Sequence, residues 1–276
     1  NGADELIFLL ANTFLNPGDE IVIPVPTFSS YAAATQIVGG VARFIPQPAL
    51  TFLLNEIVQA VHPHTKMVFL CNPNNPTGTY FTQEDLELFL DRIPAQTLVI
   101  LDEAYCQYAT SEDFPSAKGL IERYSNLLVL RTFSKVYGLA SLRIGYAVAD
   151  PKLIKELEKV RQPYNINTLA QFAAAIAWQD EGYVHKVIQE TAREREKVMA
   201  QLGELGLTVL PSQANFILVQ HQKAELIVEL LLQEGFLVRH TASFGLPDRF
   251  RLTIGPAALM EEFMAALRRI MLTIER

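Results

Sequence analysis

The run Leu127-Leu128-Val129-Leu130 is followed by Arg131 and then by Thr132-Phe133-Ser134-Lys135. Four consecutive apolar residues of this kind are typical of a strand that is buried on both faces, as in sheets that carry helices on both sides. Lys135 is therefore predicted to emerge where a buried strand ends. A lysine in a closed site can act as a nucleophile on a carbonyl group, whereas an exposed lysine stays protonated and reacts poorly.

Similar apolar runs alternate with segments of helical periodicity through the first half of the chain. The further expected strands are 20–23, 42–45, 67–70 and 98–101. The expected helices are 3–14, 29–38, 54–61 and 82–90. In the last of these helices, Thr82 is predicted as the N-cap with Asp85 at the third helical position. This alternation predicts an α/β fold with crossover connections and a mainly parallel sheet.

The pattern changes after Asp150-Pro151, where long helical segments begin. The expected helices are 151–162, 167–180, 183–205, 222–234 and 257–273. The expected strand pairs are 207–210 with 216–219, and 236–239 with 250–254. We therefore predict a large domain at 1–180 and a smaller C-terminal α+β domain at 181–276.

The composition argues against several classes of partner. The chain has 276 residues and a formal net charge of −7, so it offers no basic surface for nucleic acid. Its most apolar early segment, 6–15, is interrupted by polar residues and is shorter than the ~20 residues that span a membrane. The two cysteines, Cys71 and Cys106, are expected to be reduced thiols in a cytoplasmic protein. The five histidines show no ligand spacing beyond His62-Pro63-His64, and a turn explains that pair better than a zinc site, so no metal site is predicted.

Several polar residues follow predicted strands or begin a predicted helix. Residues 2–4 open the first helix, where unpaired amides and the helix dipole favour a phosphate. Residues 73–78, with two prolines and a glycine, specify a rigid turn that can present Asn75 inward. Ser134 and Arg143 are residue types suited to holding a phosphate beside Lys135.

Asp102 comes directly after the apolar strand 98–101. Ligands of open α/β sheets bind outside the carboxyl ends of the strands, so Asp102 is expected to face a ligand. A carboxylate in a dry site needs a cationic partner. A pyridinium nitrogen would satisfy it, with an attraction of about 4 kcal/mol at about 4 Å and an effective dielectric near 20. Tyr105 could bond a phenolic oxygen on the same ring, whereas Glu103 is expected to form a salt bridge or a cap.

These residues belong to a series of motifs that runs through the chain. The motifs are NGADE (1–5), PTF (26–28), NPNNPTG (72–78), DEAY (102–105), TFSK (132–135), LRIGY (142–146), PSQANF (211–216) and FRLTIG (250–255). In this order and spacing they resemble the fold-type I pyridoxal-phosphate aminotransferases of class II, and most closely the histidinol-phosphate aminotransferases. The resemblance covers essentially the whole chain and implies a mainly parallel, seven-stranded type of sheet.

The resemblance implies a set of roles around pyridoxal 5′-phosphate. Lys135 would form a Schiff base with the cofactor, and Asp102 would keep the ring nitrogen protonated. Asn75 and Tyr105 would bond the ring's phenolate oxygen, and Phe28 would stack on the ring. The phosphate would be held by the backbone amides of Ala3 and Asp4 together with Ser134, Arg143 and Thr132.

The resemblance also implies the substrates. Arg239 and Arg251, with Asn75, would bind the anionic end of histidinol phosphate and of glutamate or 2-oxoglutarate, because an arginine fork suits phosphate and carboxylate groups. Three alternatives remain open: an aminotransferase of aromatic amino acids, a lyase that decarboxylates threonine phosphate, and a cofactor-binding protein without turnover.

The resemblance finally implies a homodimer and a segment upstream of Asn1. In family members that segment covers the active site, and a tyrosine from it reaches the cofactor phosphate of the neighbouring subunit. We therefore expect the chain as it stands to bind the cofactor but to turn over slowly.

Overall fold

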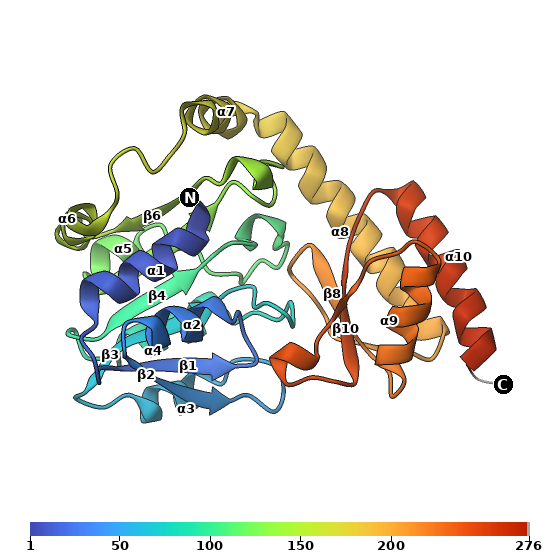
Figure 1. Cartoon of the computed structure of the whole chain (residues 1–276), viewed down its shortest axis with the longest axis horizontal. Helices are drawn as coiled ribbons and strands as arrows, with labels where there is room; N and C mark the ends of the chain where they lie inside the picture. Colours follow the sequence, from blue (N-terminus) through green and yellow to red (C-terminus); the bar gives the residue numbers. More distant parts are fainter. Residues whose placement is uncertain (275–276) are drawn as a thin grey trace.

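Six strands from the first half of the chain form one sheet in the computed structural model, which describes residues 1–274 (Figure 1). The strands are β1 (Glu20–Val25), β2 (Val41–Pro46), β3 (Thr65–Cys71), β4 (Leu98–Asp102), β5 (Leu127–Thr132) and β6 (Gly145–Ala149). Their order is β2-β1-β3-β4-β5-β6. β1 to β5 pair in parallel, and β6 pairs antiparallel with β5. The predicted α/β class with a mainly parallel sheet is confirmed.

The sheet has six strands in the described residues, not the seven that the resemblance implied. The reason is that residues 1–150 supply only six segments that pair, and no further segment joins either edge strand in the part of the chain that the structure describes. One of the six, β6, was not predicted, because Gly145 and two alanines weaken its strand character.

Helices cover both faces of this sheet. One face carries α1 (Gly2–Phe14), α2 (Ser30–Ile37) and α6 (Pro151–Val160), and the other carries α3 (Leu54–Ala60), α4 (Gln83–Leu90) and α5 (Leu120–Arg123). Along β5, Leu128 and Leu130 face the first set, whereas Leu127 and Val129 face the second. Side chains alternate across a strand, so a strand covered on both sides must be apolar throughout. The Thr82–Asp85 capping box predicted for α4 is present.

The second half of the chain builds a separate antiparallel sheet of order β7-β8-β10-β9. Its strands are β7 (Thr208–Val209), β8 (Phe216–Gln220), β9 (Arg239–His240) and β10 (Arg249–Thr253). The helices of this second lobe are α8 (Glu181–Glu204), α9 (Ala224–Gln233) and α10 (Ala257–Ile274), whereas α7 (Thr168–Gln179) packs on the first lobe against Phe133 and Ile144. Of the short 3-10 helices, η1 (Cys106–Tyr108) and η2 (Ala140–Leu142) belong to the first lobe, and η3 (Ala242–Phe244) belongs to the second.

This second lobe has its own apolar core, made by the carboxyl-terminal part of α8 with α9, α10 and the sheet. α8 runs from the first lobe to the second (Figure 1). The predicted pairing of β7 with β8 and of β9 with β10 is confirmed, but β9 is shorter than expected because only Arg239 and His240 pair with β10. The division into domains at residue 180 stays a prediction.

Residues 1–274 contain neither a helix that could span a membrane nor a group of potential metal ligands. None of the helices described is long and apolar enough to cross a bilayer. Within the same residues, no three or more His, Cys, Asp or Glu side chains are grouped so that they could hold a metal ion.

Candidate active site

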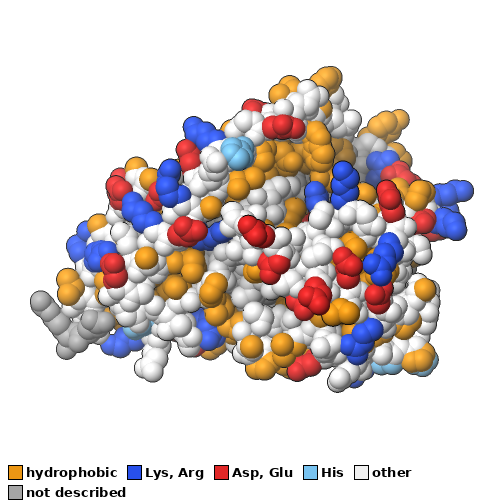
Figure 2. Space-filling model, turned by 180° about the vertical axis from the view of Figure 1, so that it is seen from behind, with side chains coloured by type: hydrophobic (Ala, Val, Ile, Leu, Met, Phe, Trp, Pro, Cys, Tyr) orange, Lys and Arg blue, Asp and Glu red, His pale blue; other side chains and the backbone are white. Residues whose placement is uncertain are grey.

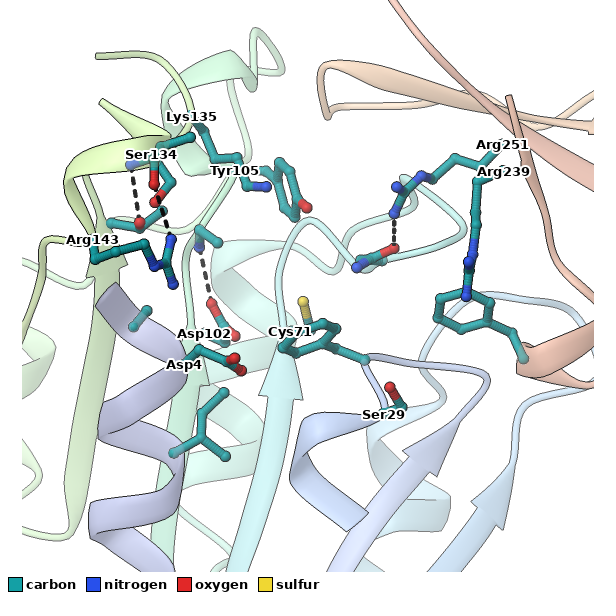
Figure 3. A pocket seen from close by; sticks show the side chains of 18 residues that line it. Asp4, Ser29, Cys71, Asp102, Tyr105, Ser134, Lys135, Arg143, Arg239 and Arg251 are labelled. Carbon is teal, nitrogen blue, oxygen red and sulfur yellow. Dashed lines mark hydrogen bonds between the residues drawn. The ribbon is translucent and has the colours of Figure 1, made fainter. Parts of the chain in front are cut away.

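A cavity of about 430 Å³ lies at the carboxyl ends of β3, β4 and β5, between the two lobes (Figure 3). It gathers side chains from helix α1, from the loops after β1, β3, β4 and β5, and from the second lobe. Every residue predicted for the site lines it: Ala3, Asp4, Phe28, Asn75, Asp102, Tyr105, Thr132, Ser134, Lys135, Arg143, Arg239 and Arg251. The structure therefore brings the set together, while the role of each residue stays a prediction.

Asp102 is the last residue of β4 and is 4% exposed. Its Oδ1 accepts a hydrogen bond from the Ala104 amide at 3.0 Å, and its Oδ2 accepts one from the Tyr31 hydroxyl at 2.7 Å. Burial raises the pKa of Asp102, while these two hydrogen bonds and the charge of Lys135 oppose the rise. A buried acid is thus held at the base of the cavity with two donors on its carboxyl group.

Lys135 lies three residues beyond β5 and reaches into the cavity, where its Nζ is 5.1 Å from the centre of the Tyr105 ring. Burial lowers the pKa of this amine, and the charges of Arg251 and Arg143 lower it further, against the opposing effect of Asp102. A lowered pKa leaves more of the amine neutral near pH 7, which is the form that attacks a carbonyl carbon.

The amino end of α1 and Arg143 form one end of the cavity. The Arg143 guanidinium donates to the carbonyl oxygen of Ala140 at 3.0 Å and to that of Asn1 at 3.4 Å. Gly2 makes this approach possible, because a Cβ there would lie 2.8 Å from Nη2 of Arg143. Gly145 likewise allows strand β6 to approach the start of α1, because a Cβ added at position 145 would lie 2.5 Å from the Ala3 nitrogen. Helix amides, a guanidinium and the nearby Ser134 hydroxyl are suited to an anion.

The opposite end belongs to the second lobe. Arg251 on β10 donates from Nη1 to the Asn75 side-chain oxygen at 2.5 Å and lies over the Phe216 ring at 4.9 Å. Its Nε is buried without a hydrogen-bond partner among residues 1–274. Arg239 is more exposed and donates to the Ser243 hydroxyl at 3.2 Å. The two arginines make this end cationic, and Arg251 keeps one buried donor available.

Sequence reasoning missed some residues that line the cavity. Ser29 precedes α2, Cys71 ends β3, and Phe244 ends η3. Cys71 could have been found by the reasoning that selected Asp102, because it also ends a central strand. Phe244 has no such signal, since it approaches from the second lobe. The salt bridge or cap expected for Glu103 is confirmed as a salt bridge, with Arg131 donating from Nη2 at 2.6 Å.

Comparisons with known proteins identify the family of this chain. The family model for class I and II aminotransferases matches residues 1–267. The chain belongs to the class I and II aminotransferase family. Its relatives include the histidinol-phosphate aminotransferase of Moorella thermoacetica, which is 44% identical over 98% of this chain and 71% of its own length. That of Bacillus subtilis is 39% identical over 98% of this chain and 76% of its own length.

A crystal structure of histidinol-phosphate aminotransferase from Sinorhizobium meliloti, in complex with pyridoxal-5′-phosphate, has the same fold. Its TM-score is 0.93 at 29% identity, and the match covers 99% of this chain and 76% of that chain. The predicted membership of the aminotransferases and the predicted fold type are both confirmed.

The residues of this aminotransferase fit pyridoxal phosphate. The approach of Arg143 to the start of α1, which depends on the missing Cβ of Gly2, makes an anion site at one end. The buried carboxyl of Asp102 suits a protonated ring nitrogen, and Lys135 is the only lysine that lines the cavity in the described part of the chain. The phosphate would thus meet the anion site, the ring nitrogen would meet the carboxyl group of Asp102, and the aldehyde would meet the amine of Lys135.

Proposed function

We propose that this aminotransferase moves an amino group between glutamate and imidazole acetol phosphate, producing histidinol phosphate and 2-oxoglutarate in histidine biosynthesis. The observation that carries the proposal is the placement of Arg239 and Arg251 on the same cavity as Lys135 (Figure 3). Two cations at one end can bind either a phosphate or a carboxylate. The relatives named histidinol-phosphate aminotransferase agree with this choice of substrate.

Pyridoxal phosphate is the cofactor, as predicted from the resemblance and as expected for this family. When bound, it supplies an aldehyde that condenses with amines and a ring that accepts the electron pair left when the substrate carbon loses its proton. The amides of Ala3 and Asp4, with Ser134 and Arg143, would hold its phosphate. Phe28 would cover the ring, and Asn75 and Tyr105 would bond its phenolate oxygen.

Two residues would handle the protons. Asp102, buried and fixed by two donors, would hold a proton on the ring nitrogen. Lys135 would supply the amine that attaches the cofactor and, once released, would be the base that moves the proton at the substrate carbon. Its lowered pKa suits both tasks, because each requires the neutral amine.

A comparison of amino donors tests the proposed substrate. Purified protein saturated with pyridoxal phosphate would be mixed with histidinol phosphate, glutamate, phenylalanine or threonine phosphate, and the visible band of the lysine-bound cofactor would be followed. We expect histidinol phosphate and glutamate to bleach the band fastest, with no carbon dioxide released from threonine phosphate. Faster bleaching by phenylalanine would favour an aromatic aminotransferase, release of carbon dioxide would favour the lyase, and a band unchanged by every donor would indicate a binding protein.

The role of Arg251 can be tested on strand β10 itself. We expect Arg251→Leu to lower kcat/KM for histidinol phosphate and for glutamate by roughly 10- to 100-fold, because a charge-assisted hydrogen bond contributes about 1.5–3 kcal/mol. The matched control is Arg249→Leu, since Arg249 lies on the same strand but pairs with Asp248 outside the cavity. Equal kcat/KM values for the two variants would exclude Arg251 as the anion-binding residue.

We propose that the chain forms a homodimer through the outer face of α7. Leu169, Phe172 and Ile176 are 76%, 68% and 71% exposed there. Figure 2 shows hydrophobic side chains gathered at the top of the molecule, over α7. The inner face of α7 packs through Ala170 and Ala174 against Phe133 and Ile144. In the sequence, Phe133 and Ile144 flank the segment from Lys135 to Arg143. A second copy on this face would lie beside the phosphate end of the cavity, as the family resemblance implies.

The dimer can be tested by its mass in solution. We expect Phe172→Lys combined with Ile176→Lys to weaken self-association at least ~100-fold, since each exposed side chain of this size contributes about 1.5–3 kcal/mol when buried. Light scattering during size exclusion would measure the change. Leu272→Lys is the control, because Leu272 is 65% exposed on α10 of the other lobe. If the α7 variant kept the dimer mass, another surface would form the interface.

The predicted cytoplasmic location stays a prediction.

A further inference from the structure

Tyr31 is a fully buried tyrosine whose hydroxyl meets the acid at the base of the cavity. It lies in the first turn of α2, is 0% exposed, and donates to Oδ2 of Asp102 at 2.7 Å. Tyr31 does not line the cavity itself. It therefore stands behind Asp102, on the side away from the space where the cofactor would bind.

Packing of the Tyr31 ring against two other aromatic rings fixes the direction in which its hydroxyl points. It stacks on Phe69 of β3, with ring centres 4.5 Å apart and planes 11° apart. It also meets the ring of Phe28 edge-on at 5.7 Å. Burial raises the pKa of Tyr31 well above its ordinary value, so the hydroxyl keeps its proton and is the donor in the bond to Asp102.

With the hydrogen bond from Tyr31, each of the two oxygens of the Asp102 carboxyl group accepts a hydrogen bond from the protein. Oδ1 is held by the amide of Ala104 and Oδ2 by Tyr31, so rotation of the group would break both bonds. Asp102 also lines the cavity, so the remaining accepting positions of its oxygens are available to a ligand there. One side chain thus touches both the acid that would meet the ring nitrogen and Phe28, which would cover the ring.

We propose that Tyr31 is a positioning residue that fixes the Asp102 carboxylate toward the ring nitrogen of the cofactor and supports Phe28 against the ring. The proposal rests on the proposed function. Without the hydroxyl, the carboxyl group loses one of its two fixed donors, becomes free to turn, and holds a proton more readily itself. The ring nitrogen then keeps its proton less completely, and the ring accepts electrons less well.

The test is Tyr31→Phe, which keeps the ring and its packing but removes the hydroxyl. The control is Tyr80→Phe, because the Tyr80 hydroxyl also donates to a carboxylate, that of Asp113 at 2.8 Å, but lies outside the cavity. Pyridoxal phosphate labelled with nitrogen-15 in the ring would report protonation of that nitrogen by NMR. We expect Tyr31→Phe to move the signal toward the neutral form and to lower kcat roughly 10-fold with KM within about threefold, as for the loss of one hydrogen bond to a charged group.

A double-mutant cycle provides a second, independent readout. Because Tyr31 acts through Asp102, adding Tyr31→Phe to Asp102→Asn should change kcat less than twofold beyond Asp102→Asn alone. The inference would be overturned by an unchanged nitrogen-15 signal and kcat in Tyr31→Phe, or by full additivity in the cycle. If instead the unsubstituted protein failed to bind the cofactor covalently or to transaminate, the proposed function would fail, which separates the two results.

Discussion

Lys135→Ala is expected to abolish the visible band of the lysine-bound cofactor and to lower kcat/KM by at least ~10⁴-fold. The side chain would provide both the attaching amine and the base, and a positioned acid–base group alone contributes about 10²- to 10⁴-fold. No other lysine among the described residues lines the cavity, so no neighbour can replace it. Absorbance of the cofactor-saturated protein and steady-state rates with histidinol phosphate measure the two effects.

The control for this prediction is Lys155→Ala, which removes an exposed lysine on α6 outside the cavity. It should keep the band and the rate. A band that persists in Lys135→Ala would mean that another amine holds the cofactor, and the assignment of Lys135 would then be wrong.

Asp102→Asn is expected to lower kcat by roughly 100- to 1000-fold while the phosphate end still binds the cofactor. An amide of the same shape has no charge to hold a proton on the ring nitrogen. The attraction lost is at most about 4 kcal/mol at about 4 Å with an effective dielectric near 20. Rates and the amount of cofactor retained after dialysis would be measured together.

The same variant should not unfold the protein. Burial raises the pKa of Asp102, so in the cofactor-free protein ionisation of this carboxyl disfavours the folded state above its ordinary pKa. Near pH 7, cofactor-free Asp102→Asn is therefore expected to melt at or above the temperature of the unsubstituted protein. A large fall in melting temperature, matching the loss of activity, would show that Asp102 has a mainly structural role.

Much of the site could be predicted because its residues follow strands. Asn75, Asp102 and Lys135 each come shortly after an apolar run, and the carboxyl ends of parallel strands meet at one edge of a sheet. The apolar runs themselves predicted the helices on both faces, since only a doubly covered strand needs to be apolar at every position. These inferences about position use local sequence alone, and the structure places all three residues on one cavity.

The contacts that depend on distant pairing could not be predicted. Tyr31 and Asp102 are 71 positions apart, and Arg251 and Asn75 are 176 positions apart. The sequence marks Tyr31 only as a residue of a short apolar helix, with nothing to indicate that its hydroxyl meets an acid. Strand β6 was missed for a related reason, because its pairing with β5 stabilises a segment whose own residues favour a strand weakly.

The most direct test of the account is to locate the covalent bond. Cofactor-saturated protein would be reduced with borohydride, digested and analysed by mass spectrometry, with protein reduced before addition of the cofactor as the control. We expect the added mass of the reduced cofactor on the peptide that contains Lys135 and on no other. Added mass on a different lysine, or none in a protein that carries the visible band, would contradict it.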